Sequence, residues 1–595
     1  MRVVFDIETN GVDFSEFFLP QVKEVFCIVT KDLDTGKISQ YYDTDGLREL
    51  GTASLQQGIN FLNSLGPNDE LIGHNIIQFD LPVLRKLHNL RTNARIHDTL
   101  VASRTLYPDR VGGHSLGGWG ERLGFDKSDF SDFTHFSLDM LEYCRRDVEL
   151  TARVYDVLHQ ETSEGRWEKA LHLEHRIAEI IAEQERVGFC FDVQKAERLL
   201  KDWEEEISGI DARCNSIVGN RVRPGATIAK PFKINGDPAL RTRRIADDYS
   251  IHLPLISGPF CVFTYEPLNF ESKAKQKELL LELGWEPENT TANGSPRLDD
   301  SIEKVGEVGR LLNRRNVISH RRSQVRGLLS SAEQDGRVHG GANPCGTNTS
   351  RMKHTKIVNI PRTSSTMGEE IRSLFVPSPG KILVGYDARA LELRILAHYI
   401  GNEEYNDRVT TTDKQRDAHT LAARAGRTDD REVGKTINYA LIYGAGDARL
   451  GNIIGGSERD GRDLRENLYR FVPGLGDLVR RAKLASSRGF LYALDGRDLY
   501  LRRRVSPLNT LIQGGGAIFM KTVAVHLDDL VQERNLDARK VVDMHDEAQW
   551  ECDPKDVEAL SSCITVAFDR AVHDLSLRCP QEPEIKIGQS WAETH

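Results

Sequence analysis

The sequence contains no run of about eighteen apolar residues, the length that a membrane-spanning helix needs. Its first residues, MRVVFDIETN, lack a basic segment followed by an apolar one, so no secretory signal is visible. The nine cysteines include no CxxC pair, which favours reduced thiols over a disulfide or zinc framework. No internal repeat or low-complexity tract is present. We therefore expect a globular protein of the cytosol.

The 595 residues are too many for one hydrophobic core, so we expect two to four domains. The first 160 residues alternate strand-like and helical segments, which predicts an α/β domain around a mixed sheet. Residues 166–215 are helical in pattern, and 216–270 interrupt them with Gly, Pro and basic residues. Helices resume to about 330, and a second α/β region follows with strands at KILVGYD and KVVDM. The pattern predicts a multidomain α/β protein.

The net charge of −10 argues against nucleic-acid binding, but this charge is distributed unevenly along the chain. Residues 1–160 hold 16 Lys and Arg against 24 Asp and Glu, so the other 435 residues carry only −2. Within them, 310–356 has ten basic and two acidic residues, and a second basic cluster is Arg502 to Arg504. Such a segment is either a solvated helix face or a surface that binds phosphates. Charge alone leaves both interpretations open.

Acidic residues of the N-terminal region form a pattern that suits metal ions. Asp6 and Glu8 are two apart in a predicted strand and so point to the same face. Asp80 ends IGHNIIQFD, and Tyr143 and Asp147 lie one helical turn apart. Each acid alone is more often a surface residue. Together at one sheet edge they would bind two hard divalent ions that activate a water and stabilise the leaving oxygen of a phosphodiester.

A second set of acids lies in the C-terminal half. Asp387 closes the apolar strand KILVGYD, and Glu392 follows on a predicted helix. The segment KVVDMHDEAQWEC predicts strand, tight turn and strand, with His545, Asp546 and Glu547 at the turn. The turn is either an ordinary polar turn or half of a metal site. A metal site requires the two segments to meet in space.

The segment DREVGKTINYALIYGAG contains Gly434-Lys435-Thr436, which looks like the end of a P-loop. A P-loop has a glycine five residues earlier, where this chain has Asp429, so that interpretation is excluded. We instead expect a helix with a stripe of two cations and two aromatic rings that would bind a triphosphate and stack on a base. The alternative is an exposed basic helix with half-buried tyrosines. The stripe consists of Arg431, Lys435, Tyr439 and Tyr443.

These motifs resemble those of two protein families, whose domains occur together in one chain in some polymerases. The N-terminal acids resemble the DEDD-type 3′–5′ exonucleases with a YxxxD motif. RxxxKxxxxxxxYG resembles the fingers helix of family A DNA polymerases, and YDARALELR and HDE resemble the palm motifs that carry the catalytic aspartates. NTLIQGGGAIF resembles the helix that reads the minor groove, and TSRMKHT resembles the arginine element near the primer. Over nearly its full length the chain is similar to phage replicative polymerases of the T7 type.

The resemblance implies an RNase H-like mixed-sheet exonuclease domain at 1–165 and a right-hand polymerase domain. The thumb would span 166–345, interrupted at about 216–270, and palm and fingers would span 346–595, with the fingers at about 400–485. It implies a template-directed DNA polymerase with proofreading that acts in phage DNA replication in the host cytosol. Two Mg²⁺ ions would serve each site, with Mn²⁺ as a substitute.

The resemblance also implies partners. These are primer-template DNA, dNTPs and a replicative helicase-primase. T7-type polymerases carry a thioredoxin-binding insertion where this chain has 216–270. A thioredoxin partner, a flexible thumb tip and direct DNA contact are the three interpretations of that segment.

Individual roles follow from the resemblance. The catalytic residues would be Asp387, Asp546, Glu547 and Lys435 for polymerisation, and Asp6, Glu8, Asp80, Tyr143 and Asp147 for proofreading. The metal ligands would be Asp387, the Ala388 carbonyl and Asp546 in one site, and Asp6, Glu8, Asp80 and Asp147 in the other. Nucleotide contacts would come from Arg431, Lys435, His419, Tyr439 beside the sugar and Glu392 in the space of a ribose 2′-hydroxyl. DNA contacts would come from Tyr443, Gln513, Asn509, Arg351 and His545.

Two features depart from the family pattern, and two other functions stay open. Arg389 stands where the family usually has a small residue, and the motif around Arg351 is two residues shorter than in T7-type chains. The chain could be a nuclease whose polymerase half is an inactive DNA clamp, or a non-catalytic DNA-binding scaffold. Against both, every acid expected of the two metal sites is present.

Overall fold

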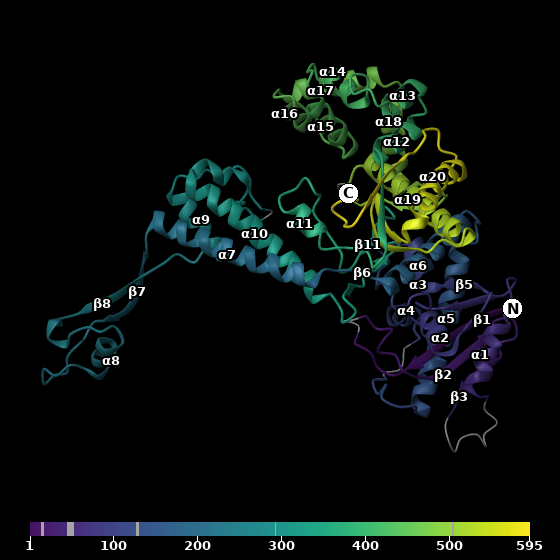
Figure 1. Ribbon diagram of the computed structural model, residues 1–595, viewed down its shortest axis with the longest axis horizontal. Coiled ribbons are helices and arrows are strands. Elements are labelled where there is room, and N and C mark those ends of the chain that lie inside the picture. The colour runs from purple at the N-terminus through teal and green to yellow at the C-terminus, as the bar shows by residue number, and fades with distance from the viewer. Residues whose placement is uncertain (14–16, 44–52, 126–129, 292, 503–504) are drawn as a thin grey trace. The chain divides into compact units, whose positions relative to one another are not determined.

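The computed structural model describes the 595 residues except 14–16, 44–52, 126–129, 292 and 503–504 (Figure 1). The chain forms two compact units. The first comprises Met1–Asp192 and Ser330–His595, and the second comprises Val193–Leu329. Within the described ranges, no helix is long and apolar enough to cross a bilayer.

A five-stranded mixed sheet lies at the N-terminus of the first unit, drawn in purple in Figure 1. Its order is β3-β2-β1-β4-β5; β2 and β3 run antiparallel and β4 and β5 parallel to β1. This confirms the mixed sheet predicted from the alternating pattern. The strands are β1 (Arg2–Thr9), β2 (Val25–Asp32), β3 (Ile38–Tyr42), β4 (Glu70–Gly73) and β5 (Arg95–Asp98).

Helices cover both faces of this sheet. Leu141, Cys144 and Val148 of α5 pack with Val4 of β1 and Val29 of β2, while α1 and α2 contribute to the core of the opposite face. Short polar side chains cap several of these helices at their N-termini, as Ser137 does for α5. The helices are α1 (Leu55–Ser64), α2 (Asp80–His88), α3 (Thr99–Leu106), α4 (Leu116–Leu123) and α5 (Leu138–Glu161).

Helix α6 (Glu168–Val187) joins the N-terminal and C-terminal parts of the first unit. Its Ile177 and Ile181 pack with Ile518 of α19 (Pro507–Glu533). A fully buried ionic group, called here the Glu174 network, reinforces this contact. Lys521 Nζ lies 2.6 Å from Glu174 Oε1, Arg497 lies 2.5 Å from the same atom, and Arg497 also pairs with Asp495 at 2.6 Å.

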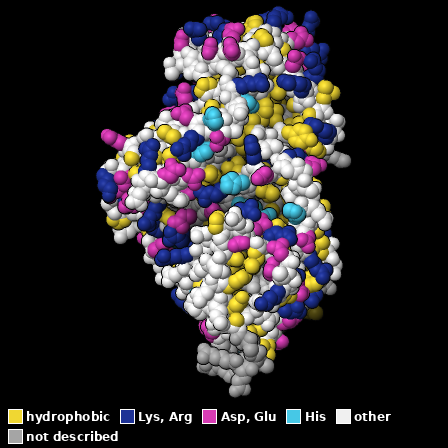
Figure 2. Space-filling view, turned by 90° about the vertical axis from the view of Figure 1, so that its right-hand side faces the viewer, with side chains coloured by type: hydrophobic (Ala, Val, Ile, Leu, Met, Phe, Trp, Pro, Cys, Tyr) yellow, Lys and Arg dark blue, Asp and Glu magenta, His cyan; other side chains and the backbone are white. Residues whose placement is uncertain are grey.

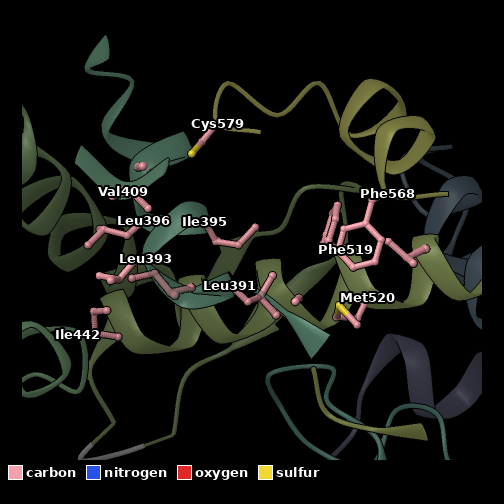
Figure 3. Close-up of a cluster of buried hydrophobic side chains, with 14 of the residues drawn as sticks. Leu391, Leu393, Ile395, Leu396, Val409, Ile442, Phe519, Met520, Phe568 and Cys579 are labelled. Atoms are coloured by element: carbon pink, nitrogen blue, oxygen red, sulfur yellow. The ribbon is translucent and has the colours of Figure 1, made fainter. Parts of the chain in front are cut away.

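The C-terminal part of the first unit contains a four-stranded antiparallel sheet in the order β15-β16-β12-β17. Helices α12, α19 and α20 contribute to its core, where the Phe519 ring meets the edge of Phe568 at 5.4 Å (Figure 3). The predicted strands at KILVGYD and KVVDM are confirmed. The elements are β12 (Ile382–Ala388), β15 (Ala538–Met544), β16 (Glu547–Cys552), β17 (Pro583–Gly588), α12 (Leu391–Ile400) and α20 (Val557–Asp574).

Six helices lie between α12 and α19 in the sequence, and together they form a layer. They are α13 (Glu403–Thr410), α14 (Ala418–Ala425), α15 (Arg431–Ile442), α16 (Asp447–Ile453), α17 (Glu458–Phe471) and α18 (Leu475–Ala485). Gly434 permits α15 to lie directly on α14, because a Cβ there would come within 2.0 Å of the His419 carbonyl oxygen. The glycine that suggested a P-loop is therefore a helix-packing glycine.

Short elements complete the first unit. Residues 189–190 and 337–338 pair as β6 (Phe189–Cys190) and β9 (Arg337–Val338). The others are β10 (Ala342–Asn343), β11 (Lys353–His354), α11 (Gly368–Arg372), β13 (Phe490–Tyr492) and β14 (Asp498–Tyr500).

The second unit is built on two long helices, α7 (Val193–Val218) and α10 (Glu307–Ser330). Ion pairs join them: Arg314 to Glu206 at 2.8 Å, and the buried Arg315 to Asp211 at 2.6 Å. Acids of α7 thus balance part of the positive charge of 310–330. The interrupting segment 216–270 has its own secondary structure, with β7 (Arg221–Ile228) paired to β8 (Phe260–Glu266), and α8 (Leu240–Asp248) between them; α9 (Lys273–Glu282) follows.

Candidate active sites

The C-terminal sheet brings three acidic residues into one row. Asp387 of β12 lies opposite Glu547 of β16 on one side and opposite Glu584 of β17 on the other. Asp546 joins them from the β15–β16 turn, where its carbonyl oxygen accepts from Ala388 N at 2.9 Å. The two predicted motifs therefore meet in space. We call Asp387, Asp546, Glu547 and Glu584 the C-terminal acid cluster.

Like charges on adjacent strands repel each other unless a cation lies between them. The Asp387 side chain is exposed to the cavity, yet desolvation by the surrounding protein, then repulsion from Asp546, Glu547 and Glu584, raises its pKa to about 7, while Arg362 acts in the opposite direction. The donors are carboxylate oxygens and backbone carbonyls, the ligands that hard divalent ions such as magnesium prefer. The cluster fits such an ion.

Glu547 differs from the other members of the cluster because it is buried and fully bonded. Arg372 of α11 pairs with it at 3.0 Å, and Gln549 Nε2 donates to it at 2.9 Å. The Trp591 indole N–H also donates to it, and His595 lies 3.6 Å away. These contacts hold Glu547 in place at the start of β16, next to the turn that carries Asp546.

Helix α15 faces the C-terminal acid cluster across an open cavity of about 840 Å³. Lys435, Tyr439 and Tyr443 line this cavity together with Asp387 and Asp546. The predicted helix is confirmed up to Ile442; Tyr443 is its C-cap and more than half exposed. The stripe therefore ends one residue beyond the last helical turn.

Two residues predicted to bind the triphosphate, Arg431 and His419, lie beside the cavity rather than among its lining residues. Arg431 pairs with Asp417 at 2.6 Å, and Asp417 also caps the N-terminus of α14. Asn438 holds the His419 ring at 3.1 Å, and that ring lies 6.4 Å from the Tyr439 ring. Burial lowers the pKa of His419.

Glu392 lies at the centre of a polar group on the cavity wall. Its Oε1 accepts from Arg351 at 3.1 Å and from the Tyr443 hydroxyl at 3.5 Å. Asn509 lies one turn before Gln513 on α19, and its buried Oδ1 has no hydrogen-bond partner among the described residues. His545 lies at the tip of the hairpin with a positive φ of 61° and lines the same cavity.

The N-terminal acids lie on β1, α2 and α5, and Asp6 and Glu8 come close to each other. Asp6 and Glu8 of β1 face α5, where the Cys144 Sγ lies 3.6 Å from Asp6 Oδ2. Asp147 lies one turn beyond Cys144 on α5 and is buried. Tyr143 is half-buried, with its ring 5.6 Å from that of Phe130. The predicted shared faces are thus present, and we call Asp6, Glu8, Asp80 and Asp147 the N-terminal acid cluster.

Asp80 begins α2 and is tied to β1 between the other two acids. Its Oδ1 accepts from Ile7 N at 3.2 Å. Burial, with a smaller contribution from Asp98, raises the pKa of Asp80 to about 7. A buried set of carboxylates of this kind fits a divalent cation for the same reason as the C-terminal cluster.

Sequence reasoning missed several residues of the C-terminal cavity. Asn359, Arg362 and Lys586 line it, and Glu584 completes the acid row. The pattern PEIKIG, an acid in a strand near the chain end, was the available signal for Glu584. Arg372 gave no local signal, because its partner Glu547 is 175 residues away.

The other basic residues that the sequence singled out differ in their surroundings. Arg389 is half-exposed and lies 3.7 Å from Glu582. Arg502 pairs with Asp109, whereas Arg503 and Arg504 lie outside the described residues. On the face shown in Figure 2, basic and acidic side chains are interspersed rather than separated. Local clusters, not a uniform field, would have to guide a polyanion here.

Comparisons with known proteins agree with this geometry. The sequence profile of DNA polymerase family A matches residues 259–593. This match covers more than half of the chain, and the chain belongs to DNA polymerase family A. Members of this family are metal-dependent.

Similar proteins extend the match to the whole chain. The DNA-directed DNA polymerases of Escherichia phage T7 and Enterobacteria phage T3 are 25% and 26% identical to it, over 100% of each chain. The alignment with the T7 protein spans 722 positions against 595 residues here, so that relative has segments that this chain lacks. The POL domain of Pol1 from M. smegmatis, solved with DNA primer-template and dNTP, superposes with a TM-score of 0.76 at 19% identity. It covers 100% of this chain and 95% of its own, and shows that the fold is shared.

Proposed function

We propose that this protein is a template-directed DNA polymerase with a 3′–5′ proofreading exonuclease, acting in phage DNA replication. One observation carries the proposal: a single cavity holds a row of acids on one wall and a lysine with two tyrosines on the other. A nucleoside triphosphate requires both walls. Its phosphates are bound by metal ions, which the acids hold, and by a cationic side chain. The similarity to phage polymerases over the whole chain supports the same conclusion.

The proposed division into exonuclease domain (1–165), thumb (166–345) and palm with fingers (346–595) follows the same similarity. The second compact unit, Val193–Leu329, lies within the proposed thumb, while α6 packs with the first unit. The layer α13–α18 falls in the proposed fingers. The cytosolic location stays a prediction.

In the polymerase site, Asp387, Asp546 and the Ala388 carbonyl would hold two Mg²⁺ ions. When bound, the ions lower the pKa of the primer 3′-hydroxyl and offset the charge of the triphosphate and of the leaving pyrophosphate. Lys435 binds the phosphates directly from the cavity wall. Arg431 and His419 lie next to that wall, and Asp417 holds the Arg431 guanidinium in place.

Other residues select the nucleotide and hold the DNA. Glu392, fixed by Arg351 and Tyr443, occupies the space of a ribose 2′-hydroxyl. Tyr439 lies beside the sugar. The remaining DNA contacts would come from Tyr443, Gln513, Asn509, Arg351 and His545.

In the exonuclease site, Asp6, Glu8, Asp80 and Asp147 would hold two Mg²⁺ ions. The Tyr143 hydroxyl orients the water that attacks the phosphodiester. Since this site and the C-terminal cavity are built from different residues, each activity can be removed alone. The alternatives, an inactive polymerase half or a non-catalytic scaffold, predict that one or both activities are missing.

Primer extension with magnesium and dNTPs tests the proposal. Asp387→Asn should abolish extension and retain shortening of a single-stranded primer, whereas Asp6→Ala with Glu8→Ala should do the reverse. Glu404→Gln, an exposed acid of α13, is the control and should change neither. A wild-type protein that shortens primers without extending them would favour the inactive-polymerase alternative, and one that does neither would favour the scaffold.

We further propose that segment 216–270 binds a processivity partner, with thioredoxin as the candidate. The paired strands β7 and β8 expose Val222, Phe263 and Tyr265, each more than half accessible to solvent, and this is unusual for apolar side chains without a partner. Exposed Lys230, Lys233 and the basic residues of α8 lie nearby in sequence. A replicative helicase-primase remains a further expected partner.

Product length per binding event, measured with and without thioredoxin, tests this partner. Thioredoxin should lengthen the products of the wild type, and Phe263→Ser with Tyr265→Ser should remove the effect. Products that stay the same length with thioredoxin, yet shorten in the double variant, would instead assign the segment to direct DNA contact.

A further inference from the structure

The hairpin of β13 and β14 carries aromatic rings on its more exposed face. Phe490 and Tyr492 lie on either side of Leu491 in β13, and Tyr500 of β14 lies opposite Phe490. Because side chains alternate between the two faces of a strand, the three rings share one face, while Leu491 and Leu499 are buried on the other. Tyr492 is 50% exposed. A solvent-facing strand face normally carries polar side chains, so this row of rings is unusual.

The rings continue into a larger aromatic surface with a cation. Tyr107, which follows α3, is 39% exposed, and its ring centroid lies 5.3 Å from that of Tyr500. The Arg488 guanidinium lies over the rings of Phe490 and Tyr492, 5.4 Å and 4.8 Å from their centroids. The surface thus combines the N-terminal and C-terminal parts of the first unit. We call Tyr107, Arg488, Phe490, Tyr492 and Tyr500 the hairpin surface.

Two arginines lie over the Tyr492 ring, and they differ in their partners. Arg166 lies 5.6 Å from the ring centroid and is paired with Asp498 at 2.8 Å and with Glu164 at 3.0 Å. Arg488 is exposed and forms no ion pair with any residue that the structure describes. An arginine that stacks on a ring keeps its N–H groups free for a phosphate. Arg488 is therefore available to a polyanion.

Packing accounts for only part of this arrangement. The two leucines already attach the hairpin to α19, where a Cβ at Gly514 would come within 2.4 Å of Leu499 Cδ1. The Phe490 and Tyr492 rings also support each other, with centroids 5.5 Å apart. Neither contact explains why Tyr492 and Tyr107 leave so much apolar surface in water, which is unfavourable.

A row of flat rings beside an unpaired arginine fits single-stranded DNA. Every base has a π-face, so unpaired bases stack on aromatic side chains whatever their sequence, and cations bind the phosphates between them. In duplex DNA the base faces are already stacked on one another and cannot use the rings. An acidic peptide would use the arginine but would gain little from the aromatic side chains.

We propose that the hairpin surface binds single-stranded DNA by stacking bases on its rings. The surface adjoins the C-terminal cavity, because Asn348, shortly before Arg351 of the cavity wall, donates to the Tyr500 carbonyl oxygen at 2.8 Å. The chain also continues from Tyr500 to Ser506, which caps α19. If the proposed polymerase function holds, the bound strand is the unpaired part of the template. Only this last consequence rests on the proposed function.

Photo-crosslinking tests where a single strand lies on the full-length protein. Oligo(dT) with one thymine replaced by iodouracil, which couples to aromatic side chains in contact with it, is bound in EDTA so that it is not shortened. Mass spectrometry of the crosslinked peptides should identify Tyr492 or Tyr107. Crosslinks confined to residues of the C-terminal cavity or the N-terminal acid cluster would overturn the proposal.

Fluorescence anisotropy with the same strand tests the contribution of the surface. Tyr492→Ser with Arg488→Ser should weaken binding at least about fivefold, the smallest loss expected for one stacked base. Both side chains are exposed, so an unchanged urea midpoint shows that the variant is folded. Phe471→Ser with Arg480→Ser, an exposed ring and an exposed arginine elsewhere, is the matched control and should bind like the wild type. Equal losses in both double variants would contradict a specific surface.

An abasic strand and polyglutamate separate stacking from charge. The wild type should bind oligo(dT) more tightly than an abasic strand of equal length, and Tyr492→Ser should reduce this preference. A preference that is unchanged in Tyr492→Ser would show that the rings do not stack on bases. Polyglutamate that removes the Tyr492 and Tyr107 crosslinks as effectively as unlabelled oligo(dT) would instead assign the surface to an acidic protein partner.

These measurements need no catalysis. If the wild type crosslinks through the hairpin surface but extends no primer with magnesium and dNTPs, the polymerase assignment fails and the binding surface stands. If primers are extended but the crosslinks lie elsewhere, the binding surface fails and the polymerase stands.

Discussion

Glu174→Gln should destabilise the protein by about 3–4 kcal/mol. Glu174 is fully buried, and its Oε1 contacts both Lys521 and Arg497. These cations lower the pKa of Glu174 from 4.5 to about 2, against the opposing effect of burial. At about 1.4 kcal/mol for each pH unit, this difference corresponds to roughly 3 kcal/mol of folding free energy. Breaking a buried pair generally costs about 3–5 kcal/mol, which agrees.

The sign of the pH dependence follows from the lowered pKa. A carboxyl group whose pKa is lower in the folded state stabilises the protein above the unfolded pKa. This contribution is therefore complete at neutral pH and is lost as the pH falls from about 4.5 through about 2. The difference between the wild type and Glu174→Gln should shrink over the same range.

Urea unfolding followed by tryptophan fluorescence measures the effect. Glu179→Gln is the matched control, because Glu179 is on the same helix and forms a half-exposed pair with Arg176 at 3.0 Å; it should cost less than about 1 kcal/mol. Adding Lys521→Met to Glu174→Gln removes the unpaired cation and should recover most of the loss. The reasoning is refuted if the single variant stays within about 1 kcal/mol of the wild type, or if the double variant is no more stable than the single one.

Three further predictions concern the C-terminal cavity. Glu392→Ala should raise ribonucleotide relative to deoxyribonucleotide insertion, since it removes the carboxylate that Arg351 holds; an unchanged ratio in single-nucleotide kinetics contradicts that role. Tyr439→Phe should increase discrimination against ddTTP relative to dTTP by roughly ten- to hundredfold, the worth of one hydrogen bond in a charged site, whereas a tyrosine that only packs predicts no change. Gly434→Ala should push α15 off α14 at a cost of about 1–3 kcal/mol and slow extension, while shortening of single-stranded primers continues; normal extension would show that the helices yield easily.

Local patterns were enough to predict much of the fold and the members of both acid clusters except Glu584. Asp387 ends an apolar strand, and His545 to Glu547 sit between two strand-like runs, so their positions follow from sequence alone. The fingers-like helix was predicted one residue too long, because the spacing of four residues continues through Tyr443 while the positive φ of Gly444 ends the helix. The spacing of the side chains does not predict the backbone conformation of Gly444.

Features that depend on distant partners could not be predicted. The sequence left the basic segment 310–356 open between a solvated helix face and a phosphate-binding surface, and it could not show that acids about a hundred residues earlier on α7 pair with Arg314 and Arg315. The Glu174 network joins residues more than 300 positions apart. The contact between the Cys144 thiol and Asp6 could not be predicted, because it depends on how α5 packs against β1. Each of these contacts exists only after the chain has folded.

The contact at Gly434 limits how the cation-bearing helices can move. At Gly434 the α15 backbone lies directly on the His419 carbonyl with no side chain between them, and closely packed backbones transmit displacement rather than absorb it. Asp417, which caps the N-terminus of α14, pairs with Arg431 of α15 and adds a second contact between the helices. If this layer moves toward or away from the C-terminal acids, His419, Arg431 and Lys435 therefore move together as one rigid body. The distances between them stay the same during the movement.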